Sequence, residues 1–187
     1  MAKNIFFDLK KLKSCGKNVI IGKTVRIRYP EHVEIGDNVI IDDFTYISTS
    51  LKIHSYLDIS SGCKIIGGKK SFVEFHQFST LSPGVILAAG SDDYMAGIAT
   101  PLVETEFKGN VEYGKIILMK HCIVGSNSVV LPNVVLEEGA CVGALSLVKK
   151  DLKSWGLYAG IPVKKINERN KEKILQLENI FIDKLKV

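Results

Sequence analysis

The strongest constraint on the fold is a set of branched apolar residues that return every sixth position. They form two runs of six and two shorter runs: Ile35, Ile41, Ile47, Ile53, Ile59 and Ile65; Leu118, Val124, Val130, Leu136, Val142 and Val148; Ile21 and Ile27; Phe75, Leu81 and Leu87. A period of six fits neither the repeat of about 3.6 residues of a helix nor the two-residue repeat of a strand. It fits a chain that turns a corner every six residues and sends one side chain inward from each flat face. The sequence therefore predicts an all-β chain wound as a parallel β-helix.

The composition fits one globular domain over residues 1–187, since 46% of the residues are hydrophobic and 24% are charged. The net charge of +5 suits an anionic ligand but is too scattered to indicate nucleic acid. No apolar stretch approaches the ~20 residues of a membrane span, and no secretory signal precedes the repeats. Cys63 and Cys122 fall at inward positions, so we expect reduced core thiols and a cytoplasmic protein.

The repeats divide the chain into a core, two ends and one long interruption. We expect a cap over residues 1–16 with a helix at 3–13, the β-helix over 17–163, and an amphipathic C-terminal helix over 164–187. A turn at 67–70 interrupts the step briefly. The segment 88–114 loses it for about thirty residues and contains five glycines and prolines. A loop of this length inside a compact domain is usually functional.

Two histidines are expected to stack on one edge. A three-sided coil takes three hexads a turn, which places His54 and His76 at equivalent positions of neighbouring turns once the insertion at 67–70 is discounted. The same count places residues 92–94 above His76. Two imidazoles beneath Asp92 and Asp93 suit general-base catalysis. The alternatives are solvated histidines, or a metal site made by the same groups, although we assign no metal. His121 is a weaker candidate, and His32 is expected at the surface.

A second group of residues suits a long ligand with a phosphorylated head. Ser126 and Ala144 each follow a glycine, where small side chains let a ligand approach the backbone. The cations Lys149, Lys150, Lys164, Lys165 and Arg169 follow in the sequence. The alternative is a solvated basic surface.

Three stretches make the chain resemble the hexapeptide-repeat acyltransferases: 123–126, 143–151 and 158–166, the last similar to the exit motif of that family. The resemblance implies a left-handed coil, a homotrimer with active sites between subunits, and acetyl-CoA as cosubstrate. By motif position Ser126, Ala144, Lys149, Lys150 and Lys164 would line the CoA site, and we add Arg169 to them.

Within this family the chain is most similar to sugar and polysaccharide O-acetyltransferases and their nucleotide-sugar N-acetyltransferase relatives. Ser91, Asp92, Asp93 and Tyr94 look like the loop of that subgroup, with Ser91 and Tyr94 as substrate-binding residues. Related enzymes carry a histidine base in this loop, and this chain does not. We therefore expect acetyl transfer to a sugar hydroxyl with His54 or His76 as base. The alternative is an amino-sugar nucleotide, whose amine needs little help from a base.

A different class also remains open. A carbonic anhydrase-like metalloprotein would need three histidine ligands around a zinc between subunits, for which His54, His76 and His121 could be counted. The acidic loop and the lysine-rich exit favour the acyltransferase.

Overall fold

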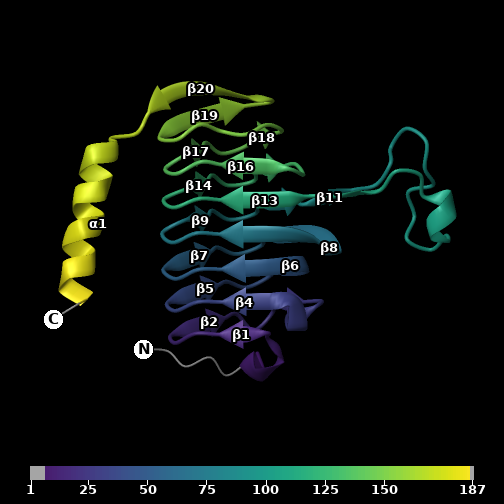
Figure 1. Ribbon diagram of the computed structural model, residues 1–187, viewed down its shortest axis with the longest axis horizontal. Helices are drawn as coiled ribbons and strands as arrows, with labels where there is room; N and C mark the ends of the chain where they lie inside the picture. The colour runs from purple at the N-terminus through teal and green to yellow at the C-terminus, as the bar shows by residue number, and fades with distance from the viewer. Residues whose placement is uncertain (1–6, 186–187) are drawn as a thin grey trace.

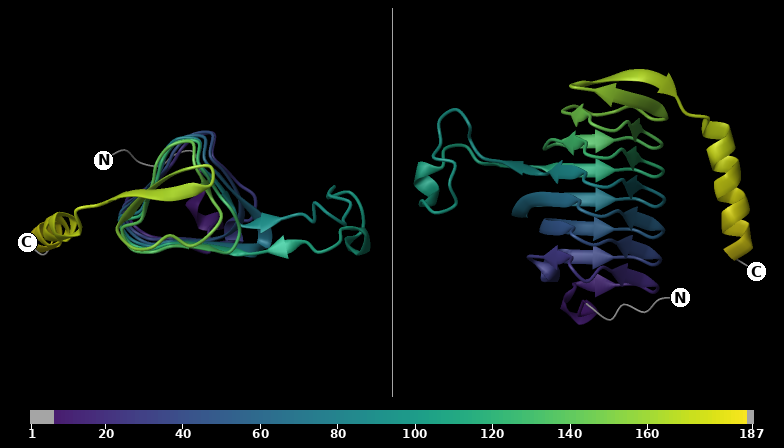
Figure 2. Two further views of the ribbon diagram at one scale, coloured as in Figure 1. Left: turned by 90° about the horizontal axis from the view of Figure 1, so that it is seen from above. Right: turned by 180° about the vertical axis from the view of Figure 1, so that it is seen from behind.

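Short strands from successive turns stack in parallel on the three faces of a triangular prism, as the computed structural model shows for residues 7–185 (Figures 1 and 2). The predicted left-handed parallel β-helix is confirmed. One sheet covers one face with β2 Val19–Ile21, β5 Val39–Ile41, β7 Leu57–Ile59, β9 Thr80–Leu81, β14 Ile123–Val124, β17 Cys141–Val142, β19 Gly156–Gly160 and β20 Val163–Glu168.

The larger sheet wraps around the other two faces. Its strands are β1 Ser14–Cys15, β3 Arg26–Ile27, β4 Val33–Ile35, β6 Tyr46–Ile53, β8 Lys64–Phe75, β10 Ile86–Ala88, β13 Lys115–Leu118, β15 Val129–Val130, β16 Val134–Leu136 and β18 Leu147–Val148. The long strands β6 and β8 bend around a corner, because β8 pairs with β10 through its first residues and with β13 through its last.

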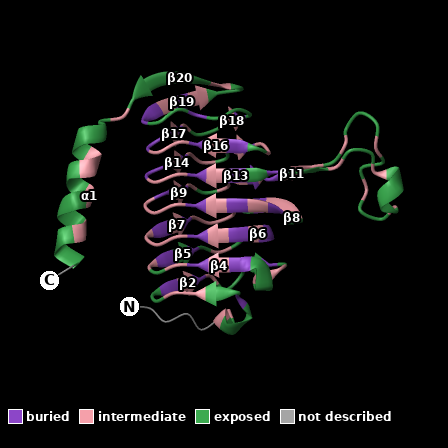
Figure 3. Ribbon diagram, in the orientation of Figure 1, coloured by how far each residue is buried: buried purple, intermediate pink, exposed green. Residues whose placement is uncertain are grey.

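The hexad residues form the core. Ile41, Ile47, Ile59 and Ile65 are fully buried, and the second run from Leu118 to Val148 is almost equally buried. Figure 3 shows this burial along the strands, whereas the two appendages of the coil are exposed. The free thiols of Cys63 and Cys122 lie in the core, where burial raises their pKa values to about 11 and about 12.

At one corner of the prism, residues in the left-handed backbone region carry a column of rings. Tyr56, Phe78, His121 and Trp155 all have φ near +60°. Their ring centroids follow one another at 5.5, 5.3 and 5.9 Å. Between the last two lies Gly139, where any Cβ would come within 2.4 Å of the Trp155 ring. We call this edge the aromatic corner.

Both ends of the coil differ from the expected helices. Of the N-terminal helix predicted over 3–13, the structure shows only the 3-10 turn η1, Leu9–Lys11, and residues 1–6 lie outside the described part. The predicted start of the C-terminal helix at residue 164 is wrong, because residues 164–168 belong to β20, which pairs antiparallel with β19. This hairpin covers the upper end of the sheet, which would otherwise expose unpaired backbone groups. The helix itself is α1, Lys171–Leu185.

The segment predicted as a loop over 88–114 leaves the coil as an arm. Its base is the two-stranded ladder of β11 Gly90–Ser91 and β12 Glu112–Tyr113, and it carries the 3-10 turn η3, Thr105–Phe107. A third 3-10 turn, η2 Pro30–His32, marks the irregularity lower in the coil. Figure 2 shows that the arm and α1 leave opposite sides of the prism.

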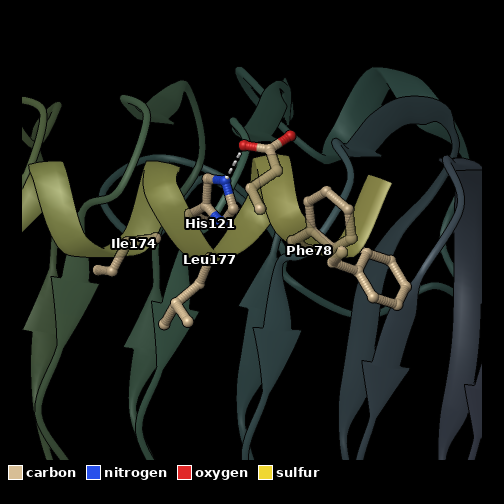
Figure 4. A pocket seen from close by; sticks show the side chains of 6 residues that line it. Phe78, His121, Ile174 and Leu177 are labelled. Carbon is tan, nitrogen blue, oxygen red and sulfur yellow. Dashed lines mark hydrogen bonds and ion pairs between the residues drawn. The ribbon is translucent and has the colours of Figure 1, made fainter. Parts of the chain in front are cut away.

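Helix α1 is held against the aromatic corner by one aromatic and one acidic side chain. Phe181 makes edge contacts with the rings of Tyr56 and Phe78, at 5.2 and 5.9 Å. Glu178, with only 7% of its side chain exposed, accepts hydrogen bonds from Lys120 Nζ at 2.5 Å and from His121 Nε2 at 2.7 Å. Figure 4 shows the His121 ring and the carboxylate to which it bonds, beside a small apolar pocket.

We expect Glu178→Ala to weaken the docking of α1. Loss of the carboxylate leaves a half-buried lysine and a buried histidine without their partner, at a cost of about 1–3 kcal/mol. Urea unfolding followed by circular dichroism measures the loss. Asn179→Ala, at an exposed neighbouring position of the same helix, is the control and should change stability by less than about 0.5 kcal/mol. Equal stability of the two variants would contradict this role of Glu178.

Candidate active site

The predicted stack of histidines is present. His54 and His76 follow the paired residues Ile53 and Phe75, and their rings lie parallel, with centroids 4.7 Å apart and planes 12° apart. The backbone N–H of His54 donates to Phe75 O, and that of His76 donates to Leu118 O. Each ring is therefore attached to a rigid rung of the ladder.

The carboxylate of Glu74 interacts with both rings. This residue was not predicted from the sequence. Glu74 Oε1 lies 2.8 Å from His54 Nε2, 3.9 Å from His76 Nε2 and 3.4 Å from Lys52 Nζ. The signal for it was present, because Glu74 is two residues before His76, as Lys52 is before His54, and the two-residue period of a strand sends such pairs to the same face.

The charges of this group are set by burial and by the neighbours. Burial opposes ionisation of Glu74, but the hydrogen bond with His54 and the charge of Lys52 outweigh it, so that the pKa of Glu74 lies below its usual 4.5. Burial, and then the neighbouring His54, lower the pKa of His76 below its usual 6.5. At neutral pH the group therefore holds an ionised carboxylate and an uncharged His76.

The acidic loop is not above these histidines, so that expectation is wrong. Leu118 pairs with Phe75, which puts Met119 on the rung above His76. Residues 92–94 lie instead in the arm, which leaves the coil at another corner. The count of hexads failed because the chain departs from the coil at the end of β10, one face before the corner with the histidines.

Within the arm, Asp93 supports the loop and does not face a cavity. Its Oδ1 accepts hydrogen bonds from the backbone N–H groups of Met95 and Ala96, and its Oδ2 accepts one from Asn110. These hydrogen bonds, of which the one from Asn110 has the largest effect, hold the pKa of Asp93 below its usual value of 3.8. Tyr94 is 85% exposed.

Ser91 and Asp92 lie at a cavity of about 380 Å³ where the arm meets the coil. The turn at Gly67 and Gly68 forms one wall. Lys108, on the returning half of the arm, also lines the cavity. Its positive charge is opposite to that of Asp92. The remaining lining residues include Pro101, Glu112 and Tyr113. The volume is at the lower end of the range for small-molecule sites, about 300–1,000 Å³.

A second cavity, of about 350 Å³, lies among the lysines at the upper end of the coil. Lys149, Lys150, Lys164 and Lys165 line it together with Tyr158. Lys165 is paired with Glu168, whereas the other three form no ion pair within residues 7–185. Three unpaired cations around a hollow can bind an anionic group such as phosphate.

These two cavities share one edge of the prism. Leu87, Val130 and Val148 pair one above another, so Lys149 lies two rungs above the point where the arm leaves. At about 4.8 Å a rung, the vertical separation is about 10 Å. We call this edge, which contains residues 67–71, 89–114, 131–133 and 149–151, the loop corner.

The other predicted cofactor residues are spread over the remaining edges. Ser126 and Ala144 lie one above the other at the third corner, where any Cβ on Gly125 would come within 2.5 Å of Ala144 N. Arg169 is not with the lysines. Its Nη1 donates to His121 O and Gly139 O, at 2.6 and 2.8 Å, so it fastens the aromatic corner.

His121 does not join the other histidines. It stacks on Phe78 and bonds to Glu178, so the three histidines do not converge within one chain over residues 7–185. His32 lies at the surface beside Glu31, as expected.

The coil, its arm and the lysine cavity define a hexapeptide-repeat acyltransferase of the left-handed β-helix type, and the chain belongs to that family. It is 38% identical over 174 residues to the dTDP-4-amino-4,6-dideoxy-D-glucose acyltransferase of Escherichia coli, covering 90% of this chain and 88% of the relative.

Solved structures of AntD, an N-acyltransferase from Bacillus cereus, are similar along their whole length. The complex with dTDP and 3-hydroxybutyryl-CoA has a TM-score of 0.91 at 39% identity, covering 99% of this chain and 100% of AntD. The complex of a variant with dTDP-4-amino-4,6-dideoxyglucose and coenzyme A has a TM-score of 0.90 at 38% identity, covering 98% and 100%. The predicted enzyme class is thus confirmed. No protein-family model matches the sequence. Within residues 7–185, no helix has the length and apolar character needed to cross a bilayer.

We expect Asp93→Ala to loosen the arm. The variant loses the acceptor of three backbone N–H groups, so amide hydrogen exchange at Met95, Ala96 and Asn110 should become faster while exchange in the coil stays unchanged. Exchange followed by mass spectrometry measures this. Glu106→Ala, which removes an exposed carboxylate from the same arm, is the matched control. Unchanged exchange in the Asp93 variant would show that other contacts hold the arm.

Proposed function

We propose that the protein transfers an acyl group from acyl-CoA to the amine of a dTDP-linked amino sugar. The observation that carries this proposal is the similarity over nearly the whole chain to enzymes named for, or bound to, such a sugar nucleotide. This favours the amino-sugar alternative over the hydroxyl acceptor that we took first from the sequence. The enzyme class is the same for both acceptors, and the difference lies in the atom that attacks the thioester.

Charged side chains at the loop corner support this assignment. Asp92 at the base of the arm can hold the sugar amine through a charge-assisted hydrogen bond, and Lys108 across the same cavity can bind the diphosphate. Ser91 lines the same cavity. Above it, Lys149, Lys150 and Lys164 can bind the phosphates of coenzyme A. Ser126 and Ala144 leave room for a ligand at another corner.

The reaction needs little proton transfer from the protein. The neutral amine attacks the thioester carbonyl, the bond from carbon to sulfur breaks, and the amine proton leaves with the thiol of coenzyme A or with water. An amine with a pKa near that of an α-amino group, about 8, is partly neutral at physiological pH. Backbone or side-chain donors at the site would stabilise the tetrahedral oxyanion. A homotrimer, which the family resemblance implies, is the assembly we propose.

The substrate assignment is tested by incubating the purified protein with acetyl-CoA and dTDP-4-amino-4,6-dideoxyglucose. Release of free thiol and the mass of the acylated product report turnover, and 3-hydroxybutyryl-CoA is the second donor to try. dTDP-glucose, which lacks the amine, is the matched control acceptor. We expect at least tenfold faster thiol release with the amine. Equal rates, or an ester product, would contradict the amine as acceptor and favour a hydroxyl.

The acceptor site is tested in the same assay by Asp92→Asn. Loss of one charge-assisted hydrogen bond, about 1.5–3 kcal/mol, predicts a fall in kcat/KM of about tenfold or more. Glu106→Gln in the same arm should behave as the unaltered protein. If the Asp92 variant also does so, the amine is held elsewhere.

Substitution of His54 or His76 by Ala tests the base predicted from the sequence. Because an amine needs less help from a base than a hydroxyl does, we expect less than tenfold loss of kcat. General-base catalysis contributes about 10²–10⁴-fold. A loss in that range would mean that the histidines reach the acceptor from a neighbouring copy.

A further inference from the structure

The cluster of His54, Glu74 and His76 has no part in the reaction described above, yet its atoms converge closely. Each residue offers one ligand atom, and the three atoms lie within 4.8 Å of one another. They come from the ends of β6 and β8, which pair in register. The side chains are half-buried, with 26%, 19% and 26% exposed. No other group of three such side chains converges in this way within residues 7–185.

Two of the three separations between the ligand atoms suit a single ion as they stand. A zinc ion binds nitrogen and oxygen at about 2.0–2.2 Å, so two of its ligand atoms lie at most about 4 Å apart. Glu74 Oε1 lies 2.8 Å from His54 Nε2 and 3.9 Å from His76 Nε2, within that limit. The two rings are nearly parallel with centroids 4.7 Å apart, so their nitrogens point the same way, and one ring must tilt out of the stack before both bind one ion.

The backbone places these ligands without help from an ion. Phe75, between Glu74 and His76, is fully buried, and the rung on either side of it is hydrogen-bonded. A site on rigid strands loses little conformational freedom when it binds a ligand. A metal ion would bind the carboxylate in its ionised form and the imidazoles in their uncharged form. The proton that His54 shares with Glu74 moves to Nδ1 when Nε2 takes the ion.

The ammonium of Lys52 supplies the positive charge that an ion would bring to Glu74. Its ammonium lies 3.4 Å from Glu74 Oε1 and is 43% exposed, so it can swing into solvent. A half-buried carboxylate is stabilised by a nearby cation, and either the ammonium or a metal ion can supply that charge.

We propose that His54, Glu74 and His76 bind one divalent transition-metal ion of the zinc class, which displaces Lys52 from Glu74. Two imidazoles and one carboxylate are ligands for zinc, cobalt, nickel and copper more than for magnesium or calcium. Three protein ligands leave a fourth position for water. Within one chain the site lies at the aromatic corner, on a different edge from the loop corner, and this proposal does not rest on the proposed function.

The test is a titration of the chelator-treated full-length protein with Co²⁺ followed by visible absorption, and with Zn²⁺ by calorimetry. We expect one ion per chain. Glu74→Gln, His54→Ala and His76→Ala should each weaken binding by at least the ~10–100-fold that outer-shell partners of a metal site cost. Lys52→Met, which removes the competing ammonium, should strengthen it. Circular dichroism confirms that each variant is folded.

The matched control is His32→Ala. His32 also lies beside a glutamate, with Nε2 3.8 Å from Glu31, but it is exposed and has no second imidazole. This variant should bind as the unaltered protein does. Wild-type affinity no higher than that of the Glu74 variant would overturn the proposal, as would a Co²⁺ spectrum with the charge-transfer band of a thiolate ligand.

Discussion

The parallel register between neighbouring turns is the constraint on which the rest of the structure depends. Each inward residue pairs with its equivalent one turn above, as Ile53 does with Phe75 and then Leu118. A side chain is therefore repeated at nearly the same place on successive rungs, about 4.8 Å apart. Residues distant in sequence therefore stack in columns along the coil. Where the sequence repeats one kind of residue, the whole column is aromatic, charged or small.

The three corners of the prism consequently have different chemistry. The aromatic corner stacks four rings and holds α1 through Phe181 and Glu178. The loop corner carries the arm with Asp92 below and the lysines above. At the third corner the small residues Ser126 and Ala144 leave the backbone accessible. A ligand that runs along an edge meets only one of these columns, which is why two groups with suitable chemistry can still belong to different sites.

Much of the site could be predicted wherever the six-residue step continues. The stacking of His54 on His76 followed from it, because an insertion of known length only shifts the count. The position of Asp92 did not follow, since the chain leaves the coil after β10 and the count has no meaning in the arm. Glu74 was missed for another reason. It lies one residue before an inward position, which the count of inward residues does not include, although the two-residue period of a strand puts its side chain on the same face as His76.

The sequence by itself determined the coil and its core residues, because a repeated inward side chain admits one way to bury itself, and three motif stretches indicated the family by resemblance. It also indicated which residues carry charge and which are small. Only the tertiary structure decided which of them meet. Arg169, close in sequence to Lys164 and Lys165, is bound to two carbonyls at the aromatic corner, while Asp92 lies beneath lysines more than fifty residues away in the chain. Such meetings depend on where a non-repeating segment leaves the coil and returns, and no periodicity records that.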